Sequence, residues 1–132
     1  SISTDVHTSS MNGDMIDMVT TMSKFLAMGM SLTDVVRLST TSAAQVINHP
    51  ELGHLSVGAV ADVAVLKLLS GNFGYSDVFG GKLEGDQRLI CEMTLKDGEI
   101  VYDWNARAAV DYREMGASYG LRDVDDIVVP QS

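Results

Sequence analysis

The sequence predicts an α/β fold in which a helical first part is followed by a second part built of strands. Apolar residues between Met11 and Gly29 recur at steps of three and four, which is the spacing of one helical face. After Pro50 the period falls to about two residues, which is typical of strands with one buried face. Asp97-Gly98 lies between two alternating segments and is a strong signal of a two-residue hairpin.

Two helical regions are expected in the first part of the chain. The first, at residues 11–29, presents a methionine-rich apolar face and ends at a glycine, where a helix C-cap is expected. Ser31 and Asp34 resemble a capping box for a second helix that begins directly after the serine. We expect this helix to break or bend around residues 40–42 and to resume over residues 43–47.

Three strands are expected in the second part. Residues 62–69 alternate between the two faces of a strand, and residues 88–96 and 99–104 flank the hairpin turn. The intervening residues 70–86 are rich in glycine with scattered aromatic side chains, which favours an irregular excursion. Beyond the strands, residues 106–115 are expected to form a short helix, and the acidic residues that follow near position 125 to form a solvated tail.

Acidic residues outnumber basic ones by 18 to 9, which gives a formal net charge of -9. A surface of this sign repels phosphate backbones and anionic lipid headgroups, so we expect neither nucleic acid nor membrane as a partner. No apolar run approaches the roughly 18 to 20 residues of a membrane span, and the first residues lack the basic and apolar regions of a signal peptide. These features predict a cytoplasmic protein.

Asp5 and His7 are the candidate site residues. Residues 2–5 have the pattern of a strand and precede a loop of Ser, Asn and Gly that leads into the first helix. In barrels of parallel strands, the carboxyl ends of the strands form the active-site face, where a carboxylate can ligate a metal or transfer a proton. Taken alone, an aspartate in such a loop is more often a helix N-cap or a loop acceptor, and a histidine there is more often an ordinary loop residue.

Three other residues whose side chains could bind a metal or act as a nucleophile are interpreted as structural. His49 and His54 bracket a proline-containing loop, which does not hold the fixed i, i+4 geometry of paired helical metal ligands. The single Cys91 lies in an alternating apolar run, so we expect a buried strand thiol rather than a nucleophile.

Five short segments carry a family resemblance: residues 2–7 (ISTDVH), 29–36 (GMSLTDVV), 53–66 (GHLSVGAVADVAVL), 79–85 (FGGKLEG) and 97–102 (DGEIVY). In this order and spacing they are similar to the C-terminal portion of amidohydrolase-superfamily enzymes, in the dihydroorotase-like amidohydrolase/deacetylase branch. The first two resemble the end of the eighth barrel strand and the start of the helix after it. The third, the most specific, resembles the passage at which such chains re-enter their small β domain.

The resemblance implies a C-terminal fragment of a (β/α)8 metal-dependent hydrolase barrel, with its last strand and helices, plus the C-terminal strands of a small β-sandwich domain. Residues 1–49 would belong to the barrel, residues 50–104 to the β domain and residues 105–132 to a C-terminal helix or tail. The complete enzyme would hydrolyse a C–N bond of a small cyclic or N-acyl amide. It would use one or two divalent metal ions, commonly zinc, with Asp5 as metal ligand and proton acceptor and His7 in contact with substrate.

The resemblance also implies that most of the active site lies elsewhere. The family's His-x-His pair, its bridging lysine and two further metal-binding histidines belong to earlier strands and are not in this sequence. We therefore expect the fragment alone to hold no metal and to be inactive, because a catalytic zinc needs about three protein ligands. The apolar faces of residues 1–48 would have to find another partner or remain exposed, which favours homo-oligomers or aggregation.

Two alternatives remain open from the sequence. One is a free-standing acidic module that binds a partner protein and has no catalytic activity. The other is a related metal-dependent deaminase that acts on a ring C–N bond and shares the strand-eight aspartate.

Overall fold

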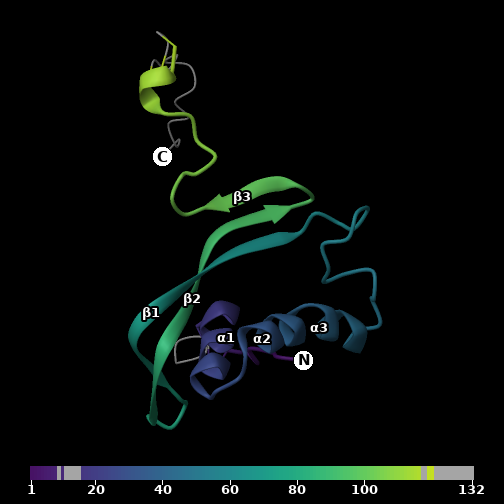
Figure 1. The fold of residues 1–132 in the computed structure, drawn as a ribbon, viewed down its shortest axis with the longest axis vertical. Coiled ribbons are helices and arrows are strands. Elements are labelled where there is room, and N and C mark those ends of the chain that lie inside the picture. The colour runs from purple at the N-terminus through teal and green to yellow at the C-terminus, as the bar shows by residue number, and fades with distance from the viewer. Residues whose placement is uncertain (9, 11–15, 117–118, 121–132) are drawn as a thin grey trace, which may run out of the picture.

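The computed structural model describes residues 1–8, 10, 16–116 and 119–120, which form a mixed α/β fold (Figure 1). Three helices come first: α1 (Met18–Ala27), α2 (Leu32–Ser39) and α3 (Thr41–Val46). An antiparallel sheet follows, in the order β1-β2-β3, with strands β1 (Val63–Ser76), β2 (Lys82–Lys96) and β3 (Glu99–Asp103). A 3-10 turn, η1 (Tyr112–Glu114), comes after the sheet. No helix of the described residues has the length and apolar character needed to cross a membrane.

Capping side chains determine where the first two helices begin. The Oδ1 atom of Asp17 accepts a hydrogen bond from the backbone N of Thr20 at 2.6 Å, so α1 starts at the next residue after this aspartate. The Oγ atom of Ser31 accepts from the backbone N of Asp34 at 3.1 Å and donates to its carboxylate at 2.7 Å. The predicted cap of the second helix is therefore confirmed.

The predicted break between the second and third helices is also confirmed. Thr40 has φ -125° and ψ -97°, which are not helical angles, and it separates α2 from α3. The first helix is shorter than predicted within the described chain, since α1 begins at Met18, and residues 11–15 of that prediction lie outside the described residues. The strand predicted for residues 2–5 is wrong for this structure, in which the backbone N of Ile2 donates to the carbonyl of Leu38 in α2 instead of to a strand.

The first hairpin is longer than the sequence predicts. Residues 70–86 were expected to be irregular, but most of them belong to β1 and β2, which run side by side to a tight turn (Figure 1). A bulge between Ser70 and Phe73 interrupts the alternation of side chains, which explains why the period-two signal is lost there. The turn itself is organised by Asp77, whose Oδ1 atom accepts from the backbone N of Phe79 and of Gly81, both at 2.8 Å.

The second hairpin confirms the prediction made from Asp97-Gly98. Both residues have positive φ, at 50° and 83°, as a two-residue turn of this kind requires. The short helix predicted over residues 106–115 is wrong, because only η1 forms there. The carboxylate of Asp103 accepts from the backbone N of Ala108 at 2.8 Å, which folds this stretch into a turn instead. The acidic tail predicted near position 125 lies outside the described residues.

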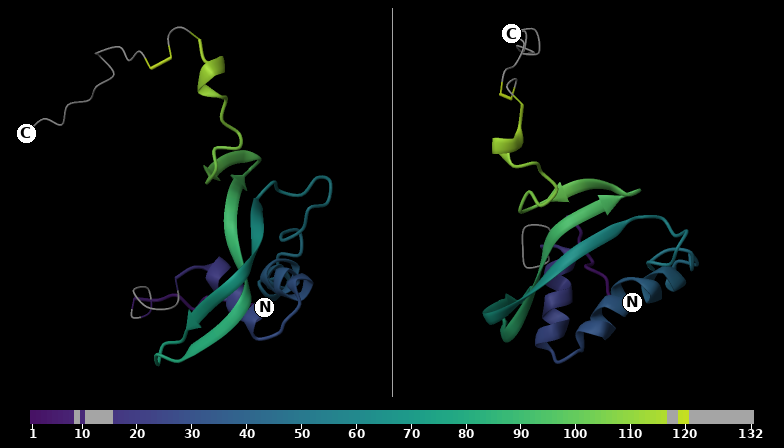
Figure 2. Two further views of the ribbon diagram at one scale, coloured as in Figure 1. Left: turned by 60° about the vertical axis from the view of Figure 1, so that its left-hand side comes forward. Right: turned by 45° about the horizontal axis from the view of Figure 1, so that its top comes forward.

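Helix α1 packs against β2, and this contact forms the core (Figure 2). The core consists of five buried apolar residues: Ile2, Met22, Leu26, Val35 and Leu89. Ser23 is 0% exposed, and its Oγ atom accepts from the backbone N of Leu89 at 2.9 Å, which joins helix to strand. Gly85 lets the helix approach closely, since a Cβ atom at this position would lie 2.7 Å from the Cβ of Ala27. The methionine-bearing face of α1 thus finds its partner in β2.

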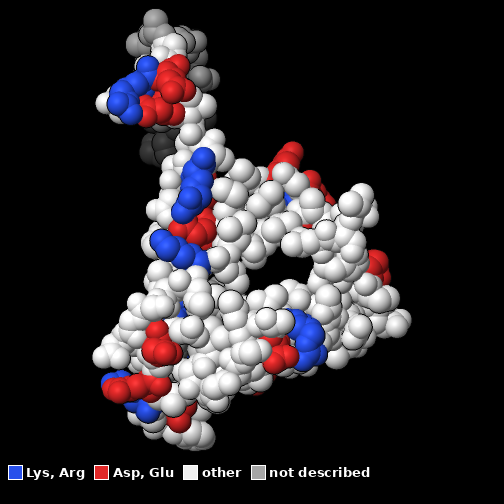
Figure 3. All heavy atoms as spheres, viewed as in Figure 1, with Lys and Arg blue, Asp and Glu red and all other residues white. Residues whose placement is uncertain are grey.

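Other apolar side chains of the helical part remain exposed. Val36 of α2 and Val46 of α3 are among them, as are Leu55 and Val57 in the segment that leads to β1. Figure 3 shows an opening through the molecule between this segment, the helices and the strands. The described residues therefore do not close around a single filled interior.

Candidate active-site residues

Asp5 lies in an exposed turn that precedes α1. Its backbone is in the left-handed region, at φ 51°, which few residues other than glycine, asparagine and aspartate adopt readily. The helix cap that an aspartate in this position could have provided belongs to Asp17 instead. No hydrogen bond or ion pair involves the Asp5 carboxylate within the part of the chain that the structure describes. The carboxylate is thus held at the surface by the backbone around it.

Ser10 organises this turn. Its buried hydroxyl accepts from the backbone N of His7 at 3.0 Å and lies 3.5 Å from the carbonyl oxygen of Asp5. The backbone N of Ser10 in turn donates to the carbonyl oxygen of His7 at 2.9 Å. The turn therefore brings Asp5 and His7 together on one exposed loop. Sequence reasoning missed Ser10, although a serine three residues after a loop residue is a usual partner for its backbone.

The described residues include no group of three His, Cys, Asp or Glu side chains that could hold a metal ion. Asp5 and His7 have suitable donor atoms, but a catalytic zinc needs about three protein ligands and an open position. His49 instead lies 2.7 Å from the Glu51 carboxylate through its Nδ1 atom, and this pair is exposed. Asp5 and His7 could therefore supply part of a metal centre, but not a complete one.

Two residues of the 53–66 segment have structural roles. Gly53 has φ 73°, and a Cβ atom there would lie 2.7 Å from the backbone of Thr40, so a side chain would collide with the α2–α3 junction. The Oδ1 atom of Asp62 accepts from the backbone N of Asp97 at 2.9 Å and ties the start of β1 to the second hairpin turn. The segment thus connects the helices to the sheet: a glycine allows the close approach to the helices, and an aspartate accepts the hydrogen bond from the hairpin turn.

A buried carboxylate on β2, that of Glu92, was not predicted. Glu92 is 3% exposed and is the extra residue of a bulge in the pairing with β1. Its carboxylate accepts from Asn105 Nδ2 at 2.7 and 2.9 Å and from Arg107 Nε at 3.2 Å. The Arg107 guanidinium, followed by Asn105, holds the pKa of Glu92 below its usual value. Among the described residues, the side chains that hydrogen-bond to this carboxylate both lie in the segment after β3, so Glu92 anchors that segment to the sheet.

Comparison with known proteins decides the family. The model of the amidohydrolase family matches residues 1–101, which include the Asp5 turn, all three helices and nearly the whole sheet. This chain belongs to the amidohydrolase family. A deacetylase of Brucella anthropi is 39% identical over 80 residues, and the deacetylase Atu3266 of Agrobacterium fabrum is 40% identical over 80 residues.

Two solved structures each contain a part that has the fold of this amidohydrolase chain. An adenine deaminase superposes with a TM-score of 0.72 at 26% sequence identity, and a dihydroorotase with a TM-score of 0.70 at 32%. Each comparison covers 78% of this chain and 28% of the solved chain. The matched part of this chain corresponds to 20% of the length of each deacetylase, so it spans about a fifth of those relatives.

Proposed function

We propose that this chain is the C-terminal part of a metal-dependent amidohydrolase that hydrolyses a C–N bond of a cyclic or N-acyl amide. One observation carries the proposal: the family match includes Asp5, whose carboxylate is exposed and does not cap a helix. The two deacetylases and the dihydroorotase support an amide substrate of small size.

Asp5 is the residue proposed to ligate the metal and to move the proton. One or two divalent cations, most commonly zinc in this family, would supply a water of lowered pKa and polarise the amide carbonyl. A carboxylate oxygen of Asp5 accepts the proton that this water loses and later delivers it to the leaving nitrogen. His7, on the same turn, is proposed to contact the substrate.

The remaining ligands are proposed to come from residues outside this sequence. The division follows the resemblance, with residues 1–49 completing a barrel, residues 50–104 completing a small β domain and residues 105–132 forming a C-terminal extension. The exposed apolar side chains of α2, α3 and the segment before β1 support this arrangement, since they offer a surface for further chain to cover. A homo-oligomeric state and a cytoplasmic location stay predictions from the sequence.

A second candidate is a deaminase that acts on a ring C–N bond. The adenine deaminase that superposes with a TM-score of 0.72 supports this candidate, although the dihydroorotase superposes almost as well, at 0.70. Both activities would use the same aspartate, so the reaction products distinguish them. Hydrolysis of an N-acyl amide releases a carboxylic acid and an amine, hydrolysis of a cyclic amide opens the ring to a new carboxylate, and deamination releases ammonia.

The experiment compares this 132-residue chain with a longer polypeptide that is extended at its N-terminus by the coding sequence upstream of Ser1. Both are incubated with zinc and assayed on N-acyl amino acids, dihydroorotate and adenine. We expect hydrolysis and stoichiometric zinc in the longer polypeptide, with neither in the 132-residue chain. Zinc and activity in the short chain would overturn the proposal, as would their absence from the long one.

A further inference from the structure

The turn between β2 and β3 consists of Asp97 and Gly98, and both residues are exposed. An aspartate that precedes a glycine can rearrange without an enzyme, because glycine has no side chain to hinder its backbone nitrogen from attacking the aspartate carboxyl group. Within the described residues, no hydrogen bond or ion pair involves the Asp97 carboxylate. The carbon atom that such a reaction requires is therefore accessible in this turn.

The nitrogen atom that would attack is held by the chain just before β1. The backbone N of Gly98 donates to the carbonyl oxygen of Ala61 at 3.0 Å, and the backbone N of Asp97 donates to Oδ1 of Asp62 at 2.9 Å. A Cβ atom at Gly98 would lie 3.7 Å from that of Ala61, so the turn is in contact with this segment. Groups tied in this way react only after the structure opens locally, and the fraction of open molecules sets the rate.

We propose that Asp97 is a modification site, at which aspartate isomerises to isoaspartate when the turn separates from Ala61 and Asp62. The Gly98 nitrogen forms a bond to Cγ of Asp97 and gives up its proton, and the hydroxyl group of the protonated carboxyl leaves with that proton as water. Water then adds to the other carbonyl of the resulting succinimide, which is that of the Asp97 backbone. The bond from this carbonyl to nitrogen breaks, the nitrogen takes up a proton, and the chain continues through Cγ.

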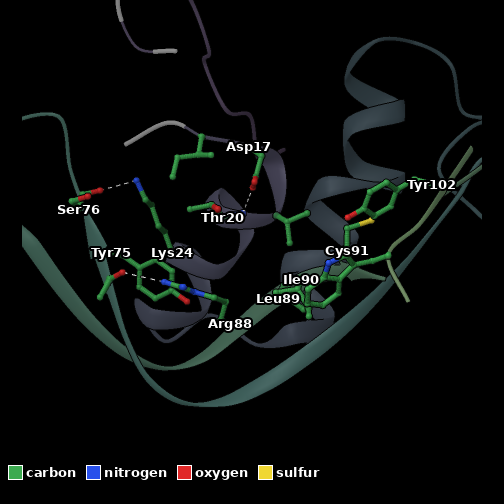
Figure 4. A pocket seen from close by; sticks show the side chains of 14 residues that line it. Asp17, Thr20, Lys24, Tyr75, Ser76, Arg88, Leu89, Ile90, Cys91 and Tyr102 are labelled. Carbon is green, nitrogen blue, oxygen red and sulfur yellow. Dashed lines mark hydrogen bonds between the residues drawn. The ribbon is translucent and has the colours of Figure 1, made fainter. Parts of the chain in front are cut away.

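Isomerisation leaves the mass unchanged but inserts a methylene group into the backbone of a two-residue turn, which alters the pairing of β3 with β2. That pairing brings Tyr102 and Trp104 to the wall of a cavity against α1, which Cys91 of β2 also lines (Figure 4). Trp104 is the single tryptophan, so its fluorescence reports a change at this end of β3. The proposal does not depend on the hydrolase activity, because neither Asp5 nor His7 takes part.

The test compares the folded 132-residue chain with a peptide of residues 94–101, in which the contact with residues 61 and 62 is absent. Both are incubated in mildly acidic buffer, which favours the protonated carboxyl. Isoaspartate is counted as methyl groups transferred from S-adenosylmethionine by an isoaspartate-specific methyltransferase, and peptide mapping assigns the modified residue. We expect isoaspartate at residue 97 in both, at a rate about 10- to 100-fold lower in the folded chain, with a parallel change in Trp104 fluorescence.

Three variants connect the rate to the contact. Asp62→Ala removes the acceptor of the Asp97 backbone N and should raise the rate about fivefold, whereas Asp62→Asn keeps an acceptor oxygen and should stay within about twofold of the unchanged chain. Asp97→Glu should abolish the signal, since its longer side chain closes a less favourable ring.

Circular dichroism checks the fold of each variant, and if Asp62→Ala unfolds, the comparison of chain with peptide decides alone. Three results would overturn the proposal. They are equal rates in chain and peptide, absence of isoaspartate from the chain once the peptide has fully converted, and an unchanged rate in a folded Asp62→Ala variant.

Discussion

Replacing Ser23 by alanine should destabilise the chain through one buried hydrogen bond between α1 and β2. Ser23 is 0% exposed, and its Oγ atom is the acceptor for the backbone N of Leu89, itself in the core. An N–H group left without an acceptor in this position costs about 1 to 3 kcal/mol. The higher helix propensity of alanine returns about 0.5 kcal/mol. The free energy of unfolding should therefore fall by about 0.5 to 2.5 kcal/mol, and a loss near the middle of this range should lower the Tm by several degrees.

The measurement is urea unfolding followed by circular dichroism, with Ser39→Ala as the matched control. Ser23 and Ser39 each donate to a carbonyl of their own helix at 2.8 Å, Ser23 to Val19 and Ser39 to Val35. Within the described residues, no strand N–H donates to Ser39. The control should stay within about 0.5 kcal/mol of the unchanged chain. If Ser23→Ala and Ser39→Ala had equal effects, the hydrogen bond between helix and strand would not be what holds α1 to β2.

Two further changes test the packing and the electrostatics of the sheet. Gly85→Ala places a Cβ atom 2.7 Å from that of Ala27 and should lower the free energy of unfolding by about 1 to 3 kcal/mol, measured by urea titration. Gly116→Ala is the control, because a Cβ atom there meets nothing within 4 Å, and it should leave the free energy of unfolding nearly unchanged. Glu92→Gln should lower the Tm at neutral pH but much less near pH 3. Arg107 lowers the pKa of Glu92 in the folded state, so the ionised carboxylate stabilises the fold at a pH above its pKa in the unfolded state. This stabilisation is lost as the pH falls through the pKa of the folded state. A Tm difference from the unchanged chain that stays constant from about pH 7 to about pH 3 would contradict this role for Glu92.

Local chemistry made part of the fold predictable. The Ser31 cap, the break at Thr40 and the turn at Asp97-Gly98 each depend on residues within four positions of one another, and each was found where the sequence predicts it. The helix expected over residues 106–115 failed for a related reason, since the competing acceptor, Asp103, lies just before the stretch that was considered.

Contacts distant in the sequence account for what was missed. The glycine-rich residues 70–86 have weak strand propensity alone, and they become strands because each side is paired with the other across a bulge. The bond from Leu89 to Ser23 joins residues 66 positions apart, which no periodicity reveals. At the site, the resemblance predicted Asp5, whereas the hydrogen bonds by which Ser10 holds the turn were not predicted, although a serine three residues after a loop residue is a usual partner for its backbone.

The exchange of Asp5 for asparagine in the polypeptide extended upstream tests the central proposal most directly. A general acid–base residue contributes about 10² to 10⁴-fold to rate, so kcat for the preferred amide should fall by that factor. Asp17→Asn is the matched control, because asparagine caps a helix as well as aspartate does, and it should leave kcat within about twofold of the unchanged enzyme. Full activity of the Asp5→Asn enzyme, with Asp17→Asn equally active, would contradict a catalytic role for this carboxylate.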